Sequence, residues 1–336
     1  MTDRAHLLTN FINTSGWSNA TRITVAGDAS NRRYERLTKP DGTTLILMDA
    51  PADKGEDVRP FIEVAEHLRS IGLSAPEIIR RDVDRGFLLI EDLGDDLFKT
   101  VIARDPSLEL PLYEASVDVL TVLHAAPLPT LEPYSSDTMT SFAARAYDWY
   151  LFGVTGARDT REQAEFEHIM ATLLAPLDSA PQVLVQRDYH AENLLWLPKR
   201  TGAARVGLLD FQDAMSGHAA YDLVSILQDA RRDVPPTIEA AMLDRYLAQN
   251  PQDDEAFRAA YAILGVQRNL RILGAFAKLC IALGKPQYID LIPRVWEFVE
   301  RNLAHPALTP VADHIIQTLP APTPDILEVL KSKCAT

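Results

Sequence analysis

Short strand-like segments dominate the first ninety residues of the chain. Five segments carry β-type alternation or a short apolar run bounded by polar turns, at residues 22–26, 33–37, 44–48, 77–80 and 86–91. One helix interrupts them, because apolar residues recur at helical spacing over residues 58–71 and Gly72 suits the position just past a helix end. The pattern predicts three strands, a helix and two further strands.

Beyond Leu93 the pattern changes to long amphipathic helices. Helical spacing is found around residues 108–125, 138–152, 161–174, 236–248, 254–282 and 288–303, with short strand-like segments at 183–186, 194–197 and 205–210. Gly94-Asp95 is a natural hinge between the two regions. We therefore expect two lobes, a nucleotide-binding lobe at residues 1–93 and a catalytic and substrate lobe at 94–336.

Composition and charge limit the possible partners. The 336 residues contain 33 Lys and Arg against 47 Asp and Glu, a formal net charge of −14. This balance argues against a nucleic-acid partner, which needs a basic face. No segment has the apolar length of a membrane span or a signal peptide, and neither Cys280 nor Cys334 lies in a C-x-x-C pair. We expect a cytoplasmic monomer with reduced cysteines and no membrane partner.

Three polar residues stand at the ends of the short strands of the second region. Asp188 and Asn193 are five positions apart between two apolar segments, and Asp210 follows another apolar segment. Strand ends that pack side by side would direct these side chains to one place. Carboxylate and amide oxygens suit Mg²⁺ that carries nucleotide phosphates, and the remaining aspartate could accept a proton from an attacking hydroxyl.

The same residues carry a resemblance to a known family. The loop Asp188-x-x-x-x-Asn193 with Asp210 resembles the catalytic loop and metal-binding aspartate of the protein-kinase-like fold. The residues that flank these three positions are closer to those of the aminoglycoside phosphotransferase family. Together with the segments at residues 27–34 and 47–51, they resemble the anomeric N-acetylmuramate/N-acetylglucosamine kinases of peptidoglycan recycling.

The resemblance implies an α+β fold of two lobes. These are a small antiparallel sheet with a helix, and a larger, mostly helical lobe. It also implies ATP and Mg²⁺ as cofactors and an amino sugar as substrate, phosphorylated at the anomeric hydroxyl. Asp188 would be the catalytic base, Asn193 and Asp210 the magnesium ligands, and Asp222 a support for the catalytic loop. The residues implied in nucleotide binding are Ser30, Asn31, Arg32, Glu91 and Leu93.

Two departures from the kinase pattern concern the phosphates of ATP. The loop expected over them has a single glycine, Gly27, where kinases are glycine-rich. The position of the phosphate-binding lysine on the third strand is Met48. Our hypothesis is that Arg32 or Arg33 supplies the missing positive charge.

Residues that contact the sugar are harder to predict, because motifs are weakest in the helical region. The candidates are Glu192 in the catalytic loop, Arg268 and Arg271 at i, i+3 on one helix, and Trp149 as a stacking surface. One alternative function keeps the reaction but changes the acceptor to an aminoglycoside or another small alcohol such as choline or homoserine. The other is a non-catalytic nucleotide-binding module.

Overall fold

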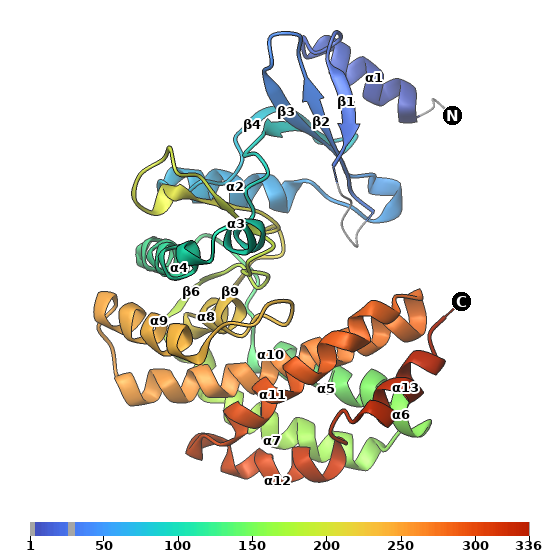
Figure 1. The fold of residues 1–336 in the computed structure, drawn as a ribbon, viewed down its shortest axis with the longest axis vertical. Coiled ribbons are helices and arrows are strands. Elements are labelled where there is room, and N and C mark those ends of the chain that lie inside the picture. Colours follow the sequence, from blue (N-terminus) through green and yellow to red (C-terminus); the bar gives the residue numbers. More distant parts are fainter. Residues whose placement is uncertain (1–3, 26–30, 336) are drawn as a thin grey trace. The chain divides into compact units, whose positions relative to one another are not determined.

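The computed structural model describes residues 4–25 and 31–335, which are drawn in Figure 1. The chain divides into two compact units. Unit 1 comprises Met1–Ala126 and Glu192–Ala214, and unit 2 comprises Pro127–Ala191 and Met215–Thr336.

Unit 1 is built on a five-stranded antiparallel sheet in the order β1-β2-β3-β5-β4. Its strands are β1 (Thr21–Thr24), β2 (Arg33–Thr38), β3 (Thr44–Asp49), β4 (Ile78–Asp82) and β5 (Phe87–Glu91). Helix α2 (Arg59–Ser70) connects β3 to β4. The predicted order of three strands, a helix and two strands is confirmed.

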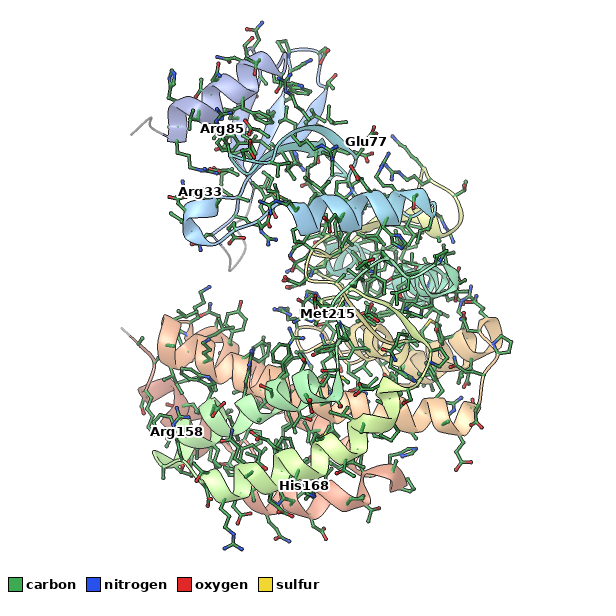
Figure 2. All side chains as sticks on the ribbon, turned by 180° about the vertical axis from the view of Figure 1, so that it is seen from behind. Arg33, Glu77, Arg85, Arg158, His168 and Met215 are labelled. Atoms are coloured by element: carbon green, nitrogen blue, oxygen red, sulfur yellow. A yellow bond between two sulfur atoms is a disulfide. The ribbon has the colours of Figure 1, made fainter. Side chains whose placement is uncertain are left out.

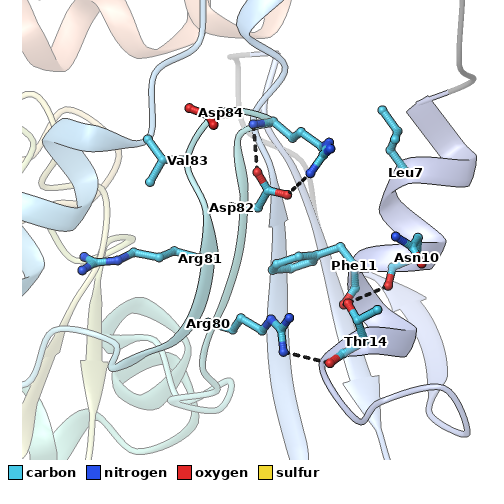
Figure 3. Close-up of a pocket in the computed structure, with 10 residues that line it drawn as sticks. Leu7, Asn10, Phe11, Thr14, Arg80, Arg81, Asp82, Val83 and Asp84 are labelled. Atoms are coloured by element: carbon cyan, nitrogen blue, oxygen red, sulfur yellow. Dashed lines mark hydrogen bonds and ion pairs between the residues drawn. The ribbon is translucent and has the colours of Figure 1, made fainter.

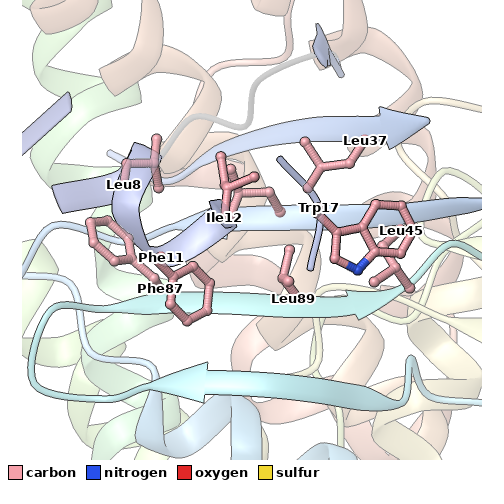
Figure 4. Close-up of a cluster of buried hydrophobic side chains, with 9 residues drawn as sticks. Leu8, Phe11, Ile12, Trp17, Leu37, Leu45, Phe87 and Leu89 are labelled. Atoms are coloured by element: carbon pink, nitrogen blue, oxygen red, sulfur yellow. The ribbon is translucent and has the colours of Figure 1, made fainter. Parts of the chain in front are cut away.

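A helix that the sequence analysis did not predict, α1 (Arg4–Thr14), packs on this sheet (Figure 4). Leu8, Phe11 and Ile12 on α1 belong to one buried cluster with alternate residues of the sheet. The sheet residues of that cluster are Leu37, Leu45, Leu47, Phe87 and Leu89. Alternation along a strand places such residues on one face, so α1 covers that face and removes it from water.

The rest of unit 1 is helical apart from one small hairpin. Its helices are α3 (Phe98–Arg104) and α4 (Glu109–Ala125), and its hairpin pairs β7 (Leu194–Trp196) with β8 (Val206–Leu208). Although β7 and β8 are distant in sequence from the N-terminal sheet, the Leu208 N–H donates to the Ser74 carbonyl oxygen at 2.9 Å. The hairpin is therefore bonded to the segment that follows α2.

Unit 2 is mostly helical, with one two-stranded antiparallel ladder of β6 (Gln182–Val185) and β9 (Met215–His218). Its helices are α5 (Ser136–Arg145), α6 (Phe152–Thr155), α7 (Thr160–Asp178), α8 (Ala220–Leu227), α9 (Pro236–Gln249), α10 (Asp254–Leu283), α11 (Ile292–Leu303), α12 (Thr309–Thr318) and α13 (Pro324–Ser332). A π-helical segment, Ala146–Leu151, joins α5 to α6. Helix α10 is the longest element of the described residues, and more than half of its residues are buried among its neighbours.

The expected α+β class, with a small antiparallel sheet and a mostly helical second region, is confirmed. The division into compact units differs from the lobes expected at 1–93 and 94–336, because α3, α4 and the β7–β8 hairpin belong to unit 1. A hinge dipeptide is visible in a sequence, whereas the packing of a later hairpin against an earlier helix is not.

The expectation that both cysteines are reduced and unpaired is wrong in this structure. Cys280 in α10 and Cys334, just after α13, form a disulfide with Cα atoms 4.8 Å apart. The two residues are separated by 54 positions, and only the packing of α13 beside α10 brings them together. Over residues 4–25 and 31–335, no helix combines the length and apolar character needed to cross a membrane.

Candidate active site

The predicted catalytic base, Asp188, lies in a loop of unit 2 that follows β6, and the backbone before it is held by α8. The carboxylate of Asp222 accepts hydrogen bonds from the N–H groups of Gln186 at 2.6 Å and Arg187 at 2.9 Å. The hydroxyl of Ser225 donates to the carbonyl oxygen of Arg187 at 3.1 Å. Arg187 has a φ of 71°, which is uncommon for a residue with a Cβ. These bonds hold a strained turn directly before Asp188.

Asp222 is enclosed completely, with 0% of its surface exposed. Burial raises the pKa of its carboxyl to about 7, although the two backbone N–H groups act in the opposite direction. Its hydrogen bonds to the loop backbone fit the supporting role predicted for it.

Asp188 itself keeps access to solvent, with 31% of its side chain exposed. A guanidinium nitrogen of Arg271, on α10, lies 3.8 Å from its carboxylate oxygen. Burial raises the pKa of Asp188, but the neighbouring positive charges, that of Arg271 first, outweigh this and lower the pKa below its ordinary value. Asp188 is therefore ionised at neutral pH and able to accept a proton.

The two arginines predicted as substrate contacts have different environments. Arg271 lies beside Asp188 and donates to the hydroxyl of Tyr221 at 3.1 Å. Arg268 is only 3% exposed and donates to the hydroxyl of Ser225 at 2.8 Å. Arg268 lies about one turn from Arg271 on α10, but its side chain is in the protein interior. The structure therefore gives no support for substrate contact by Arg268.

The predicted magnesium ligands lie together in unit 1. Asn193 precedes β7 and Asp210 follows β8, so the antiparallel hairpin places both residues at the same end. The Asn193 amide nitrogen is 3.4 Å from a carboxylate oxygen of Asp210, and the Gln212 side chain donates to the other oxygen at 2.7 Å. Asp210 has a φ of 56°, so the chain turns sharply at this residue.

These two side chains fit a divalent cation such as Mg²⁺. One carboxylate and one amide oxygen are hard donors, and Mg²⁺ is commonly bound by one or two protein groups plus phosphates and water. Within residues 4–25 and 31–335 there is no group of three or more His, Cys, Asp and Glu side chains that could hold a metal ion alone. Asn193 and Asp210 would supply the protein ligands of such an ion, with phosphates and water as the others.

The loop predicted to cover the ATP phosphates is described only at its end, and Ser30 lies outside the described residues. The N–H of Asn31 donates to the Glu56 carboxylate at 3.0 Å, and the Arg32 guanidinium forms an ion pair with the same group at 2.8 Å. The neighbouring Arg33, labelled in Figure 2, is exposed at the start of β2. Glu56 thus fixes the end of this loop. Met48, at the position of the kinase lysine, is 1% exposed and packs in the core.

The predicted adenine-binding segment follows the end of β5. The carboxylate of Glu91 is engaged by Arg200 at 2.5 Å and by Arg69 at 3.5 Å, and the Glu91 N–H donates to the Glu77 carbonyl oxygen at 2.8 Å. For Leu93, no backbone hydrogen bond to its N–H is found among the described residues. The Glu91 side chain is thus engaged within unit 1, and adenine binding by the backbone of this segment stays a prediction.

The other two sugar candidates also lie at defined places. Glu192, in unit 1, forms an ion pair with Lys99 at 2.6 Å. Trp149, in the π-helical segment of unit 2, is half-buried, and the ammonium group of Lys278 lies 5.6 Å from its ring centroid.

A cavity of about 420 Å³ in unit 1 contains none of the predicted site residues (Figure 3). It lies between α1 and the turn from β4 to β5. Arg80 donates to the Thr14 carbonyl oxygen at 2.8 Å, and Arg85 pairs with Asp82 at 2.7 Å. Arg80, Asp82 and Arg85 are thus engaged by the protein itself.

Two residues that orient the site were not predicted from the sequence. Gln212 stands within the motif that contains Asp210, so its position was visible although its hydrogen bond was not. Glu56 had no signal, because it is 24 positions from Arg32 and only the fold brings them together.

Comparison with known proteins identifies the family. The sequence pattern of the Phosphotransferase enzyme family matches residues 21–261. The chain belongs to this family. It is 40% identical over 335 residues to the N-acetylmuramate/N-acetylglucosamine kinase of Caulobacter vibrioides, covering 89% of this chain and 92% of that relative. It is 33% identical over 301 residues to the protein of the same name in Pseudomonas aeruginosa, covering 86% of each.

Solved structures of low sequence identity share the fold. A putative aminoglycoside phosphotransferase from Ralstonia eutropha superposes with a TM-score of 0.64 at 13% identity, covering 88% of this chain and 98% of that one. A choline kinase from Streptococcus pneumoniae superposes with a TM-score of 0.61 at 14% identity, covering 88% and 99%. The protein-kinase-like fold expected for this phosphotransferase is confirmed.

Proposed function

We propose that this phosphotransferase is an amino-sugar kinase of peptidoglycan recycling. It transfers the γ-phosphoryl group of ATP to the anomeric hydroxyl of N-acetylmuramate or N-acetylglucosamine, and the products are the sugar 1-phosphate and ADP. The observation that carries the proposal is the 40% identity, over 89% of the chain, to a relative named for both sugars. The ionised Asp188 beside Arg271 supplies the group that such a reaction needs.

Asp188 acts as the general base. Its carboxylate accepts the proton of the anomeric hydroxyl as that oxygen bonds to the γ-phosphorus and the bond from the γ-phosphorus to ADP breaks. The hydrogen bonds from Gln186 and Arg187 to Asp222 hold the loop so that this carboxylate is oriented before the sugar arrives. Little covalent chemistry falls to the protein, so positioning and electrostatics account for most of the rate.

Asn193 and Asp210 would hold the magnesium ion of MgATP. When bound, the ion supplies positive charge next to the phosphate oxygens, where negative charge develops. Gln212 donates a hydrogen bond to one carboxylate oxygen of Asp210, and the other oxygen lies next to the Asn193 amide.

Nucleotide binding falls to the N-terminal region, residues 1–93, as the sequence suggested. Asn31 and Arg32, held by Glu56, lie at the end of the loop that would cover the phosphates. The backbone at Leu93 would bind adenine, next to Glu91. Glu192 and Trp149 stay candidates for sugar contact.

The test is ADP release with MgATP over a panel of acceptors: N-acetylmuramate, N-acetylglucosamine, glucose, kanamycin, choline and homoserine. Phosphorus NMR identifies the phosphorylated oxygen. We expect turnover on the two N-acetylated sugars with phosphate on the anomeric oxygen. Turnover only on kanamycin or a simple alcohol would refute the substrate, and nucleotide binding without any turnover would refute the enzyme.

A further inference from the structure

Several arginines gather around one aromatic ring in unit 2, close to the proposed base. The guanidinium carbon of Arg145, in the last turn of α5, lies 4.2 Å from the ring centroid of Phe142. Those of Arg187 and Arg271 lie 5.7 and 5.9 Å from the same centroid. Arg271 is the residue that lies 3.8 Å from Asp188. Positive charge is therefore concentrated beside the base, in a chain whose net charge is −14.

Arg271 is paired with Asp188, whereas Arg145 has no carboxylate partner among the described residues. Among the described residues it forms no ion pair and no side-chain hydrogen bond, and its side chain is exposed. The nearby carboxylate of Asp148 is engaged by Arg158 at 3.2 Å. The part of Arg145 that packs against the protein loses hydration, and this and then the charge of Arg271 lower the pKa of Arg145. An anion at this place would relieve the repulsion between the guanidinium groups.

The position of Arg145 is fixed by the backbone. A Cβ on Gly274 of α10 would clash with the carbonyl group of Arg145, so the two helices touch there without a side chain between them. Arg145 is also the last residue before the π-helical segment, a distortion that is frequent at functional sites. Stacking on Phe142 holds one face of the guanidinium and leaves its N–H edges available to a planar carboxylate.

This inference rests on the proposed function. N-acetylmuramate differs from N-acetylglucosamine by a lactyl ether on O3, which ends in a carboxylate. Arg145 and Arg271 approach the same Phe142 ring, and Arg271 lies beside Asp188. A sugar whose anomeric hydroxyl meets Asp188 would therefore present another ring substituent, such as that on O3, to Arg145. We propose that Arg145 is a specificity-determining residue, which binds the lactyl carboxylate of N-acetylmuramate.

The test compares kcat/KM for the two sugars in the full-length protein. We expect Arg145→Ala to lower kcat/KM for N-acetylmuramate ~10–100-fold, the loss expected for a charge-assisted hydrogen bond, mainly through KM. For N-acetylglucosamine, which has no carboxylate, kcat/KM should change less than about threefold. Arg145→Lys should keep part of the N-acetylmuramate activity, because it keeps the charge without the planar pair of donors.

Arg161→Ala is the control, because it removes an arginine charge from an exposed position of α7. It should leave kcat/KM for both sugars unchanged. The methyl ester of N-acetylmuramate is a second probe, and it should be a poor substrate for the wild type. In Arg145→Ala, kcat/KM should be the same for the ester and for the free acid. Thermal unfolding checks that each variant is folded.

The outcomes separate the possible sources of the anion. An equal loss for both sugars would assign Arg145 to a phosphate group of the nucleotide or to folding, and would overturn the proposal. An unchanged kcat/KM for N-acetylmuramate would overturn it too. A wild type that phosphorylates kanamycin but neither amino sugar would refute the proposed function, and this inference with it.

Discussion

A guanidinium nitrogen of Arg271 lies 3.8 Å from a carboxylate oxygen of Asp188, although the two residues come from α10 and from the loop after β6. The arginine is also bonded to Tyr221, so its position does not depend on Asp188 alone. Opposite charges at this distance favour the ionised carboxylate. The pair therefore keeps the proposed base ready to accept a proton.

Removing this charge should change the pH dependence of the reaction. In Arg271→Met the pKa of Asp188 rises, because burial is then opposed by fewer positive charges. A base with a higher pKa becomes protonated at a higher pH, so the acid limb of the profile of kcat/KM should move to higher pH. The measurement is kcat/KM for N-acetylglucosamine from about pH 3 to 8, a range that extends below the ordinary pKa of an aspartate. An acid limb at the wild-type position would show that Arg271 does not tune Asp188.

Asp188→Asn keeps the shape of the side chain but removes the group that accepts the proton. We expect kcat to fall ~10²–10⁴-fold, the usual contribution of a general base, with KM for ATP little changed. The measurement is steady-state ADP release, with nucleotide affinity measured by calorimetry. Activity within tenfold of the wild type would remove Asp188 from this role.

Asp210→Asn should weaken the binding of magnesium with ATP. The substitution replaces a carboxylate by a neutral amide in a pair with Asn193. We expect the Mg²⁺ concentration for half-maximal activity to rise about tenfold or more, since hard cations prefer charged oxygen ligands. Gln212→Ala, which removes only the hydrogen bond to Asp210, should have a smaller effect. A Mg²⁺ titration curve that coincides with the wild type in Asp210→Asn would contradict the ligand assignment.

The two arginines next to the phosphate loop have different environments in the structure. Arg32 is held by Glu56 at 2.8 Å, whereas Arg33 is exposed. We expect Arg32→Ala to raise KM for ATP about tenfold, because a fixed charge next to the phosphates would be lost. Arg33→Ala is the matched control and should raise KM for ATP less. If both variants keep the wild-type KM and kcat, neither arginine replaces the missing lysine of β3.

Local patterns predicted most of the fold. The five strands of the N-terminal sheet follow from alternation or short apolar runs, and α10 follows from apolar spacing over 254–282, close to its observed bounds of Asp254–Leu283. Helix α1 was missed although Leu8, Phe11 and Ile12 have helical spacing, because eleven residues before the first strand gave a short signal. The family assignment and the amino-sugar kinase relatives expected from the motifs are confirmed.

What the sequence could not predict depends on contacts between distant segments. The ion pair of Arg32 with Glu56 spans 24 positions, and the disulfide of Cys280 with Cys334 spans 54. The same holds for Arg268 and Arg271, which are only three positions apart on one helix. Their i, i+3 spacing predicts a shared face of α10, but only the packing around Ser225 shows that Arg268 is buried.

His218, the last residue of β9, should make the stability of the protein depend on pH. Its ring lies 5.9 Å from that of Phe257, and its Nδ1 accepts a hydrogen bond from the Ala220 N–H at 3.2 Å. Burial lowers the pKa of His218 from 6.5 to about 4. A ring nitrogen that accepts a hydrogen bond cannot be protonated without breaking it, so the neutral form belongs to the folded state.

The sign of the effect follows from proton binding. Between pH 6.5 and about 4 the unfolded chain binds a proton at His218 and the folded chain does not. The free energy of unfolding should therefore fall as the pH is lowered through this window, by up to ~3 kcal/mol. Below about pH 4 both states are protonated and the contribution of His218 becomes constant.

His218→Gln removes the titrating group, so the difference in unfolding free energy between pH 7 and pH 4.5 should become smaller than in the wild type. Urea unfolding at the two pH values measures it. His168→Gln is the control, because His168 is exposed on α7 (Figure 2) and its replacement should leave the difference unchanged. If His218→Gln keeps the full wild-type pH dependence, the acid sensitivity arises from other groups.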